Sequence, residues 1–226
     1  MQVRAFVAVS LCGLALYLAL KDSSARGAVI PLPSTATDGS GNLLPGGSFD
    51  PHYRAVIGPG VNAVGPAVVY SASNIWSQWV PDDPHSGWIG FRDNSDSSPH
   101  GDYTYELLVN LTGYDPATAS ISGSWAADQF GSINLNGAAT GVSLPDGNWN
   151  SANAPNLNPF SISSGFHSGL NTLDFVVNEP DGFDGLRVSS MTLTATPVPE
   201  PSTCCLLIGG AAIAGLARAR SGRAKH

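Results

Sequence analysis

Apolar and polar residues alternate along several stretches of the chain, and this alternation predicts β-strands. In residues 102–111 every second position is apolar or aromatic, and most positions between them are polar. Residues 118–125 and 173–178 follow the same rule, with Trp125 and Phe175 among the apolar positions. Because a period of two places alternate side chains on one face of a strand, each stretch is expected to bury one face.

Turn residues and a change of parity predict further elements. Asn136-Gly137 predicts a two-residue hairpin, because both residue types tolerate positive φ. The apolar parity changes halfway through residues 186–193, which predicts a β-bulge near Ser189-Ser190. Shorter strands are expected at residues 67–70, 87–92 and 160–163.

Short strands at this spacing predict an all-β fold, a β-sandwich of two antiparallel sheets over residues 28–195. No long amphipathic helix is visible in that stretch. Residues 28–66 are rich in Gly, Pro, Ser and Asn, and their apolar runs are too short to place strands.

The first 27 residues have the pattern of a secretory signal peptide. Arg4 precedes an uncharged apolar run, residues 5–20, and small residues follow that run. We expect export by the secretion translocase and cleavage by signal peptidase after Ala25 or Gly27. An uncleaved N-terminal anchor is the alternative.

Residues 196–226 contain three consecutive elements. A proline-rich segment contains Val198, Pro199, Glu200 and Pro201. An apolar run, residues 204–217, follows and predicts a transmembrane helix, short for a bilayer core of about 30 Å. A basic cluster ends the chain and predicts a stop-transfer signal that stays cytoplasmic; it contains Arg218, Arg220, Arg223 and Lys225.

This three-part tail resembles the PEP-CTERM sorting signal. The resemblance implies that an exosortase, a membrane protease, recognises the tail and cleaves near Pro-Glu-Pro. It also implies that the protein is exported and held for a time in the inner membrane, with its domain on the periplasmic side. Its expected destination is the cell surface or an exopolysaccharide matrix.

Charge and cysteine content narrow the function of the domain. The chain has a net charge of -7, but residues 28–195 carry three arginines, no lysine and 15 acids, a net charge of -12. Nucleic-acid binding requires a basic surface, so the composition excludes it. All three cysteines lie in the terminal segments, at positions 12, 204 and 205. The domain is therefore expected to contain no disulfide.

Several segments between residues 87 and 195 are similar to a galactose-binding-like module found in PEP-CTERM proteins. They include Gly87-Trp88-Ile89, Tyr103-Thr104-Tyr105, Trp125-Ala126-Ala127-Asp128 and residues 170–178. The resemblance implies a jelly-roll-like sandwich, often with a structural calcium ion, and it does not imply catalysis.

Two acidic loops are candidate metal sites. Asp82 and Asp83 lie in one loop, and Asp93 and Asp96 lie in the next. Calcium takes oxygen ligands from such groups, so the four carboxylates are candidate ligands for a structural calcium ion. Solvated acidic turns are the simpler alternative. A catalytic carboxylate pair is a further alternative, although no partnered base is evident.

The tryptophans are candidate sugar platforms. Trp149 lies in a Gly-Asn-rich loop and is expected to be exposed, which makes it the candidate ligand-binding residue. Trp88 and Trp125 lie on apolar strand faces and are expected in the core. Trp76 and Trp79 differ by three positions, so a strand would bury one of them.

Known catalytic motifs are absent from the sequence, which contains no Walker loop, HExxH, CxxC or GxSxG. No catalytic residue is therefore assigned. The sequence favours an exported, non-enzymatic structural or weak glycan-binding module. The alternatives are a small secreted polysaccharide hydrolase and a calcium-bound matrix protein without glycan specificity.

Overall fold

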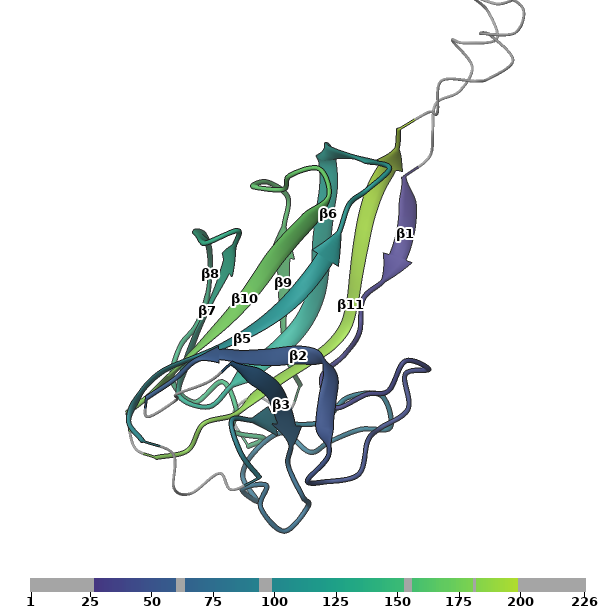
Figure 1. Cartoon of the computed structure of the whole chain (residues 1–226). Helices are drawn as coiled ribbons and strands as arrows, with labels where there is room; N and C mark the ends of the chain where they lie inside the picture. Colours follow the sequence, from purple (N-terminus) through teal and green to yellow (C-terminus); the bar gives the residue numbers. More distant parts are fainter. Residues whose placement is uncertain (1–26, 60–63, 94–98, 153–155, 181, 199–226) are drawn as a thin grey trace, which may run out of the picture. The chain divides into compact units, whose positions relative to one another are not determined.

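The computed structural model describes residues 27–59, 64–93, 99–152, 156–180 and 182–198 (Figure 1). Within these ranges all regular secondary structure is β-strand. A search of the same residues finds no helix with the length and apolarity needed to cross a membrane. The signal-peptide helix and the transmembrane helix expected from the sequence lie outside the described residues.

The described strands form one antiparallel sheet. Their bounds are β1 (Ala28–Pro31), β2 (Phe49–Ile57), β3 (Gly65–Val69), β4 (Ile89–Gly90), β5 (Gly101–Asn110), β6 (Tyr114–Ala127), β7 (Phe130–Leu135), β8 (Ala138–Leu144), β9 (Asn158–Ile162), β10 (Leu170–Glu179) and β11 (Leu186–Pro197). Hydrogen bonds connect them in the order β8-β7-β10-β5-β2-β3-β4-β11-β6-β9, and β1 pairs with β11.

This topology confirms the all-β, jelly-roll-like sandwich predicted from the sequence. The two layers expected as separate sheets are joined through β3 and β4, so that one sheet folds back on itself and nearly closes. A nearly closed sheet leaves few backbone groups unpaired, which limits pairing with other chains.

The buried side chains that alternate along β5 and β10 form the centre of the core. Tyr105 and Leu107 lie opposite Phe175 and Leu173, and each of these side chains is at most 3% exposed. Trp125 of β6 packs against Phe175 with ring centroids 5.6 Å apart, so an aromatic contact joins the layers. Burying one such side chain contributes about 1.5–3 kcal/mol, so these faces supply much of the stability.

The predicted turn and bulge are both confirmed. Asn136 and Gly137 connect β7 to β8 with φ of 53° and 77°, as a type I′ turn requires. Ser190 of β11 has φ of 53°. The buried side chains Val188 and Met191 flank this position with opposite parity, so the bulge returns both halves of β11 to the core.

The early part of the domain, which the sequence pattern did not resolve, contributes β1 and β2. β1 pairs with the end of β11, where Ala28 lies opposite Ala195 (Figure 1). β2 lies between β3 and β5, and its pairing with β3 shifts register between Phe49 and Arg54, around Pro51. A proline and a register shift within one strand hide it from a search for strict alternation.

The hairpin turn provides a test of the fold. We expect Gly137→Ala to lower the free energy of unfolding by about 1–2 kcal/mol, because an L-residue is strained at this φ. An added Cβ at Gly137 meets no atom within 4 Å, so the cost is conformational rather than steric. Urea unfolding followed by tryptophan fluorescence measures the change.

The matched control is Gly65→Ala at the start of β3, where φ is not positive and an added Cβ also meets nothing within 4 Å. It is expected to change stability by less than about 0.5 kcal/mol. Equal effects at the two positions would contradict the turn assignment.

Candidate functional site

The described residues form an open cleft of about 440 Å³ at one end of β1 and β2. Its walls come from residues 31–34, residues 37–41, His52 of β2 and His85 of the loop before β4. Small-molecule sites in proteins commonly occupy about 300–1,000 Å³, so the cleft has the size of a ligand site.

A buried carboxylate organises the β2 side of the cleft. Asp50 is 1% exposed and accepts hydrogen bonds from the backbone N–H groups of Ala36 (2.7 Å), His52 (2.8 Å) and Tyr53 (3.0 Å). Burial raises the pKa of Asp50, and these three donors oppose that shift. The hydroxyl of Tyr53 donates to the carbonyl of Pro33 at 3.0 Å, which fixes the opposite wall.

Thr35 connects three segments behind the cleft. Its fully buried hydroxyl donates to the carbonyl of Gly87 at 2.7 Å and accepts from the N–H of Val188 at 2.9 Å. Its own N–H donates to the carbonyl of Val188 at 3.0 Å. A single threonine therefore positions the 31–41 segment against both β11 and the loop before β4.

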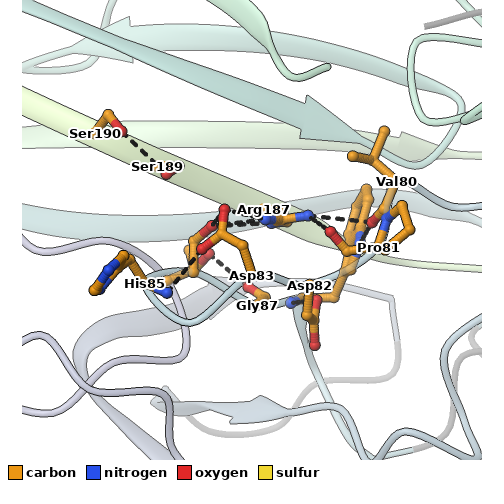
Figure 2. A network of polar contacts seen from close by, with 12 residues as sticks. Val80, Pro81, Asp82, Asp83, His85, Gly87, Arg187, Ser189 and Ser190 are labelled. Carbon is orange, nitrogen blue, oxygen red and sulfur yellow. Dashed lines mark hydrogen bonds and ion pairs between the residues drawn. The ribbon is translucent and has the colours of Figure 1, made fainter. Parts of the chain in front are cut away.

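A buried arginine holds that loop against β11, as Figure 2 shows. The Arg187 side chain is 2% exposed, and its Nη2 lies 2.7 Å from Oδ2 of Asp83. Its Nε donates to Oγ of Ser86 at 3.0 Å, and its Nη1 donates to the carbonyls of Val80 and Pro81. Side-chain and backbone acceptors together replace the water lost by the guanidinium.

The Arg187 guanidinium offsets part of the negative charge of two carboxylates in this loop. Burial lowers the pKa of Arg187, and the carboxylates of Asp83 and Asp82 oppose that change. Burial likewise raises the pKa of Asp82, with Arg187 acting in the opposite direction. Asp82 accepts from the N–H of Trp88 at 3.1 Å, and Asp83 from the N–H of His85 at 2.7 Å. Both candidate calcium ligands of this loop thus have donors from the protein.

The second acidic loop is arranged similarly. Asp93 accepts from the N–H and hydroxyl of Ser71 at 2.7 and 2.5 Å and from Nδ2 of Asn74 at 3.0 Å. Burial acts to raise the pKa of Asp93, but hydrogen bonds, first those from Ser71, lower it overall. Asp96 lies outside the described residues. Over the ranges that the structure describes, no three His, Cys, Asp or Glu residues form a cluster able to hold a metal, and calcium binding stays a prediction.

The exposure predicted for Trp149 is wrong, since its side chain is only 8% exposed. The cause is Asn148, whose side chain accepts from the N–H of Ala127 at 2.9 Å and donates to the carbonyls of Gln129 (2.7 Å) and Pro145 (2.8 Å). These bonds turn the loop inward and press Trp149 into the protein.

The other tryptophans also belong to the packing. Trp88 and Trp125 are fully buried, as predicted, and Trp79 is the buried member of its pair. Trp76 is half-buried and packs against Trp149 and Phe183, with ring centroids 4.9 and 5.2 Å away. A sugar platform needs an open ring face, and Trp76 already uses its ring to contact two other aromatic rings.

Further buried acids in the described residues accept hydrogen bonds inside the core. Asp184 is fully buried and accepts from the hydroxyl of Tyr105 at 2.6 Å and the N–H of Phe91 at 2.9 Å. Asp128 is also fully buried and accepts from Nε1 of Trp79 at 3.0 Å. Burial, then the charge of Asp184, raises the pKa of Tyr105 well above its ordinary value.

The outer face of β2, β5 and β10 carries a row of charged residues. Arg54 lies 3.4 Å from Glu106, and Asp174 is the register partner of Glu106 on the other side. Burial, then the nearby Glu106 carboxylate, raises the pKa of Asp174. Like charges directly opposite each other destabilise a sheet.

The cleft could not be predicted from the sequence. Its histidines are far apart in sequence, and most of its wall comes from residues 31–41, where no strand was placed. The available signal was the concentration of small polar residues and glycines in that segment, which is common to all surface turns.

Comparison with known proteins supports the export signal. Residues 197–221 match the PEP-CTERM protein-sorting motif, which confirms the sorting signal predicted from the sequence. The motif implies an exported protein with a C-terminal membrane-anchoring signal and an exosortase as its processing partner. A search of curated proteins found no match.

Similarity to solved structures is weak. A β-D-glucuronidase from Dictyoglomus thermophilum is 11% identical with a TM-score of 0.39, over 78% of this chain and 29% of that chain. The chain thus spans less than a third of that enzyme. A CBM35 from Paenibacillus barcinonensis is 18% identical (TM-score 0.32; 58% and 89% covered). A family 35 carbohydrate binding module from Clostridium thermocellum is 13% identical (TM-score 0.33; 57% and 98%).

The buried arginine yields a stability test. We expect Arg187→Met to lower the free energy of unfolding by about 3 kcal/mol, because the loop acceptors lose their donor. Arg54→Met removes the exposed ion pair with Glu106 and should cost less than about 1 kcal/mol. Urea unfolding compares the two variants, and equal losses would show that Arg187 does not order the loop.

The charged row yields a pH test. Because the folded pKa of Asp174 is raised, the fold loses stability as pH rises from the unfolded value, about 3.9, through the folded value. Asp174→Asn should therefore be more stable than wild type at pH 7, by about 0.2–1 kcal/mol, and the gap should close below about pH 3.

The control is Asp146→Asn, which removes a carboxylate from an exposed loop position and should change stability by less than about 0.5 kcal/mol. Thermal unfolding between pH 3 and pH 7 makes the comparison. A gap for Asp174→Asn that stays constant with pH would show that charge is not the cause.

Proposed function

We propose that this chain is an exosortase-processed protein of the cell surface or exopolysaccharide matrix, with a β-sandwich that acts as a non-enzymatic structural or weak glycan-binding module. The carrying observation is the sorting motif, which starts at residue 197, the last residue of β11. The sandwich is therefore the cargo that the signal delivers.

In the proposed route the N-terminal segment directs export and the C-terminal segment directs sorting. The N-terminal segment directs the chain to the translocase and is removed by signal peptidase. The apolar run at residues 204–217 then holds the chain in the inner membrane, and the basic cluster keeps its end cytoplasmic. Cleavage near Pro199, Glu200 and Pro201 would release the sandwich.

Placement of the acidic groups supports a non-enzymatic role. Asp38 is the only carboxylic acid among the described residues that line the cleft. Glycoside hydrolysis ordinarily uses two carboxyl groups on either side of the scissile bond. The alternative proposals are a small secreted hydrolase of polysaccharide and a calcium-bound matrix protein without glycan specificity.

The sorting proposal predicts how processing responds to changes in the tail. Replacing Glu200 and Pro201 together by alanine, or deleting residues 218–226, should leave the C-terminal segment attached and the protein in the membrane fraction. Wild type should instead yield a shorter form that ends near residues 199–201. Intact-mass spectrometry of membrane and extracellular fractions measures both forms.

The matched control for this experiment is Ser202→Ala, one position after the Pro-Glu-Pro motif. It should be processed and released like wild type. Unchanged mass and location in the Glu200 and Pro201 variant would overturn the proposal.

A further inference from the structure

The cleft next to β1 and β2 has a chemistry that selects among ligands. Its walls carry the side chains of Ser34, Thr37 and Ser40, the imidazoles of His52 and His85, and backbone groups of two glycines. Asp38 and the side chains of two prolines and one leucine line the remainder. Hydroxyl and imidazole groups both donate and accept hydrogen bonds, as sugar hydroxyls do.

An unsatisfied polar atom lies in one of these walls. Nε2 of His52 is buried and has no hydrogen-bond partner among the described residues. Buried polar groups are nearly always paired. Because Nε2 is closed to solvent, a ligand hydroxyl can pair with it only after the imidazole turns toward the cleft. The backbone N–H of His52 is held by Asp50, which fixes its place in the wall.

Hydrogen bonds within the protein order the walls of the cleft. Asp50, Thr35 and Arg187 join the segments that form the cleft through buried hydrogen bonds. A preformed site spends little free energy on ordering its own groups when a ligand binds.

Charge then excludes one class of glycan. The described lining residues include one acid, Asp38, and no lysine or arginine. Hydrogen bonds, first that from the N–H of Asn42, lower the pKa of Asp38, so this carboxyl stays ionised. Of the three domain arginines, Arg187 is buried, Arg54 pairs with Glu106, and the exposed Arg92 is not among the residues that line the cleft. A uronate carboxylate would meet negative charge without a cation to pair with it.

We propose that this cleft binds the uncharged, hydroxyl-rich sugar residues of a neutral glycan and rejects uronate polymers. This inference rests on the glycan-binding part of the proposed function and assigns it to a specific site. His85 is an exposed residue of the cleft lining and hydrogen-bonds the ligand in this proposal.

Titration calorimetry with the full chain in detergent tests the inference. The probes are neutral glucan, galactan and mannan oligosaccharides and, in parallel, an oligogalacturonate. Binding of at least one neutral probe is expected, with no heat from the oligogalacturonate. His85→Ala should weaken the neutral interaction about fivefold, the value of one hydrogen bond.

A second variant adds a large side chain to the cleft lining. An added Cβ at Gly39 meets no atom within 4 Å, so Gly39→Phe should fold normally and abolish binding. His100→Ala and Gly65→Phe are the matched controls, because both positions lie outside the cleft and are open or exposed. Both should bind like wild type.

Three outcomes would overturn the inference: no heat from any neutral probe, tighter binding of the oligogalacturonate, or unchanged binding in both cleft variants. Trimming near residues 199–201 is scored separately, by intact-mass spectrometry of the membrane and extracellular fractions. Normal trimming without binding would remove the cleft assignment alone, whereas failed trimming would remove the sorting proposal whatever the calorimetry shows.

Discussion

Burial of the Arg187 guanidinium is the interaction on which the arrangement around the cleft depends. A buried cation is costly unless every donor finds an acceptor, so the chain from Val80 to Ser86 has to lie where its carbonyls and Asp83 can reach it. That position of the loop presents His85 to the cleft and Gly87 to Thr35. The residues described between 27 and 198 include no cysteine, so polar contacts do here what disulfides do in many exported domains.

Asp50 and Thr35 likewise form buried hydrogen bonds that position the other wall of the cleft. Each satisfies backbone groups from segments that regular strand pairing leaves unpaired. The contacts of Thr35 span 52 and 153 positions of sequence, and those of Arg187 span more than 100. The cleft is therefore a product of tertiary structure, built where the sheet is least regular, while the alternating strands supply the core.

The contrast between alternating strands and long-range polar contacts explains which features could be predicted from the sequence. The alternation in β5 and β10, the turn at Asn136-Gly137 and the bulge at Ser190 depend on neighbouring residues, and all of them could be read directly. The export signal at 197–221 is equally local. Strand β2 and the burial of Trp149 could not be read, because a register shift and the hydrogen bonds of Asn148 decide them. The cleft depends on contacts between residues far apart in sequence, so it could not be predicted from the sequence either.

The pairing of β1 with β11 has a mechanical consequence. Ala28 lies opposite Ala195 in an antiparallel pair. The start of β1 and the end of β11 therefore lie side by side, roughly 5 Å apart. Tension applied between these two ends would open the β1–β11 hydrogen bonds one after another, because the load falls on one bond at a time rather than on the whole ladder. If the protein is held at only one of these two ends, no tension acts between them and the β1–β11 pair stays closed.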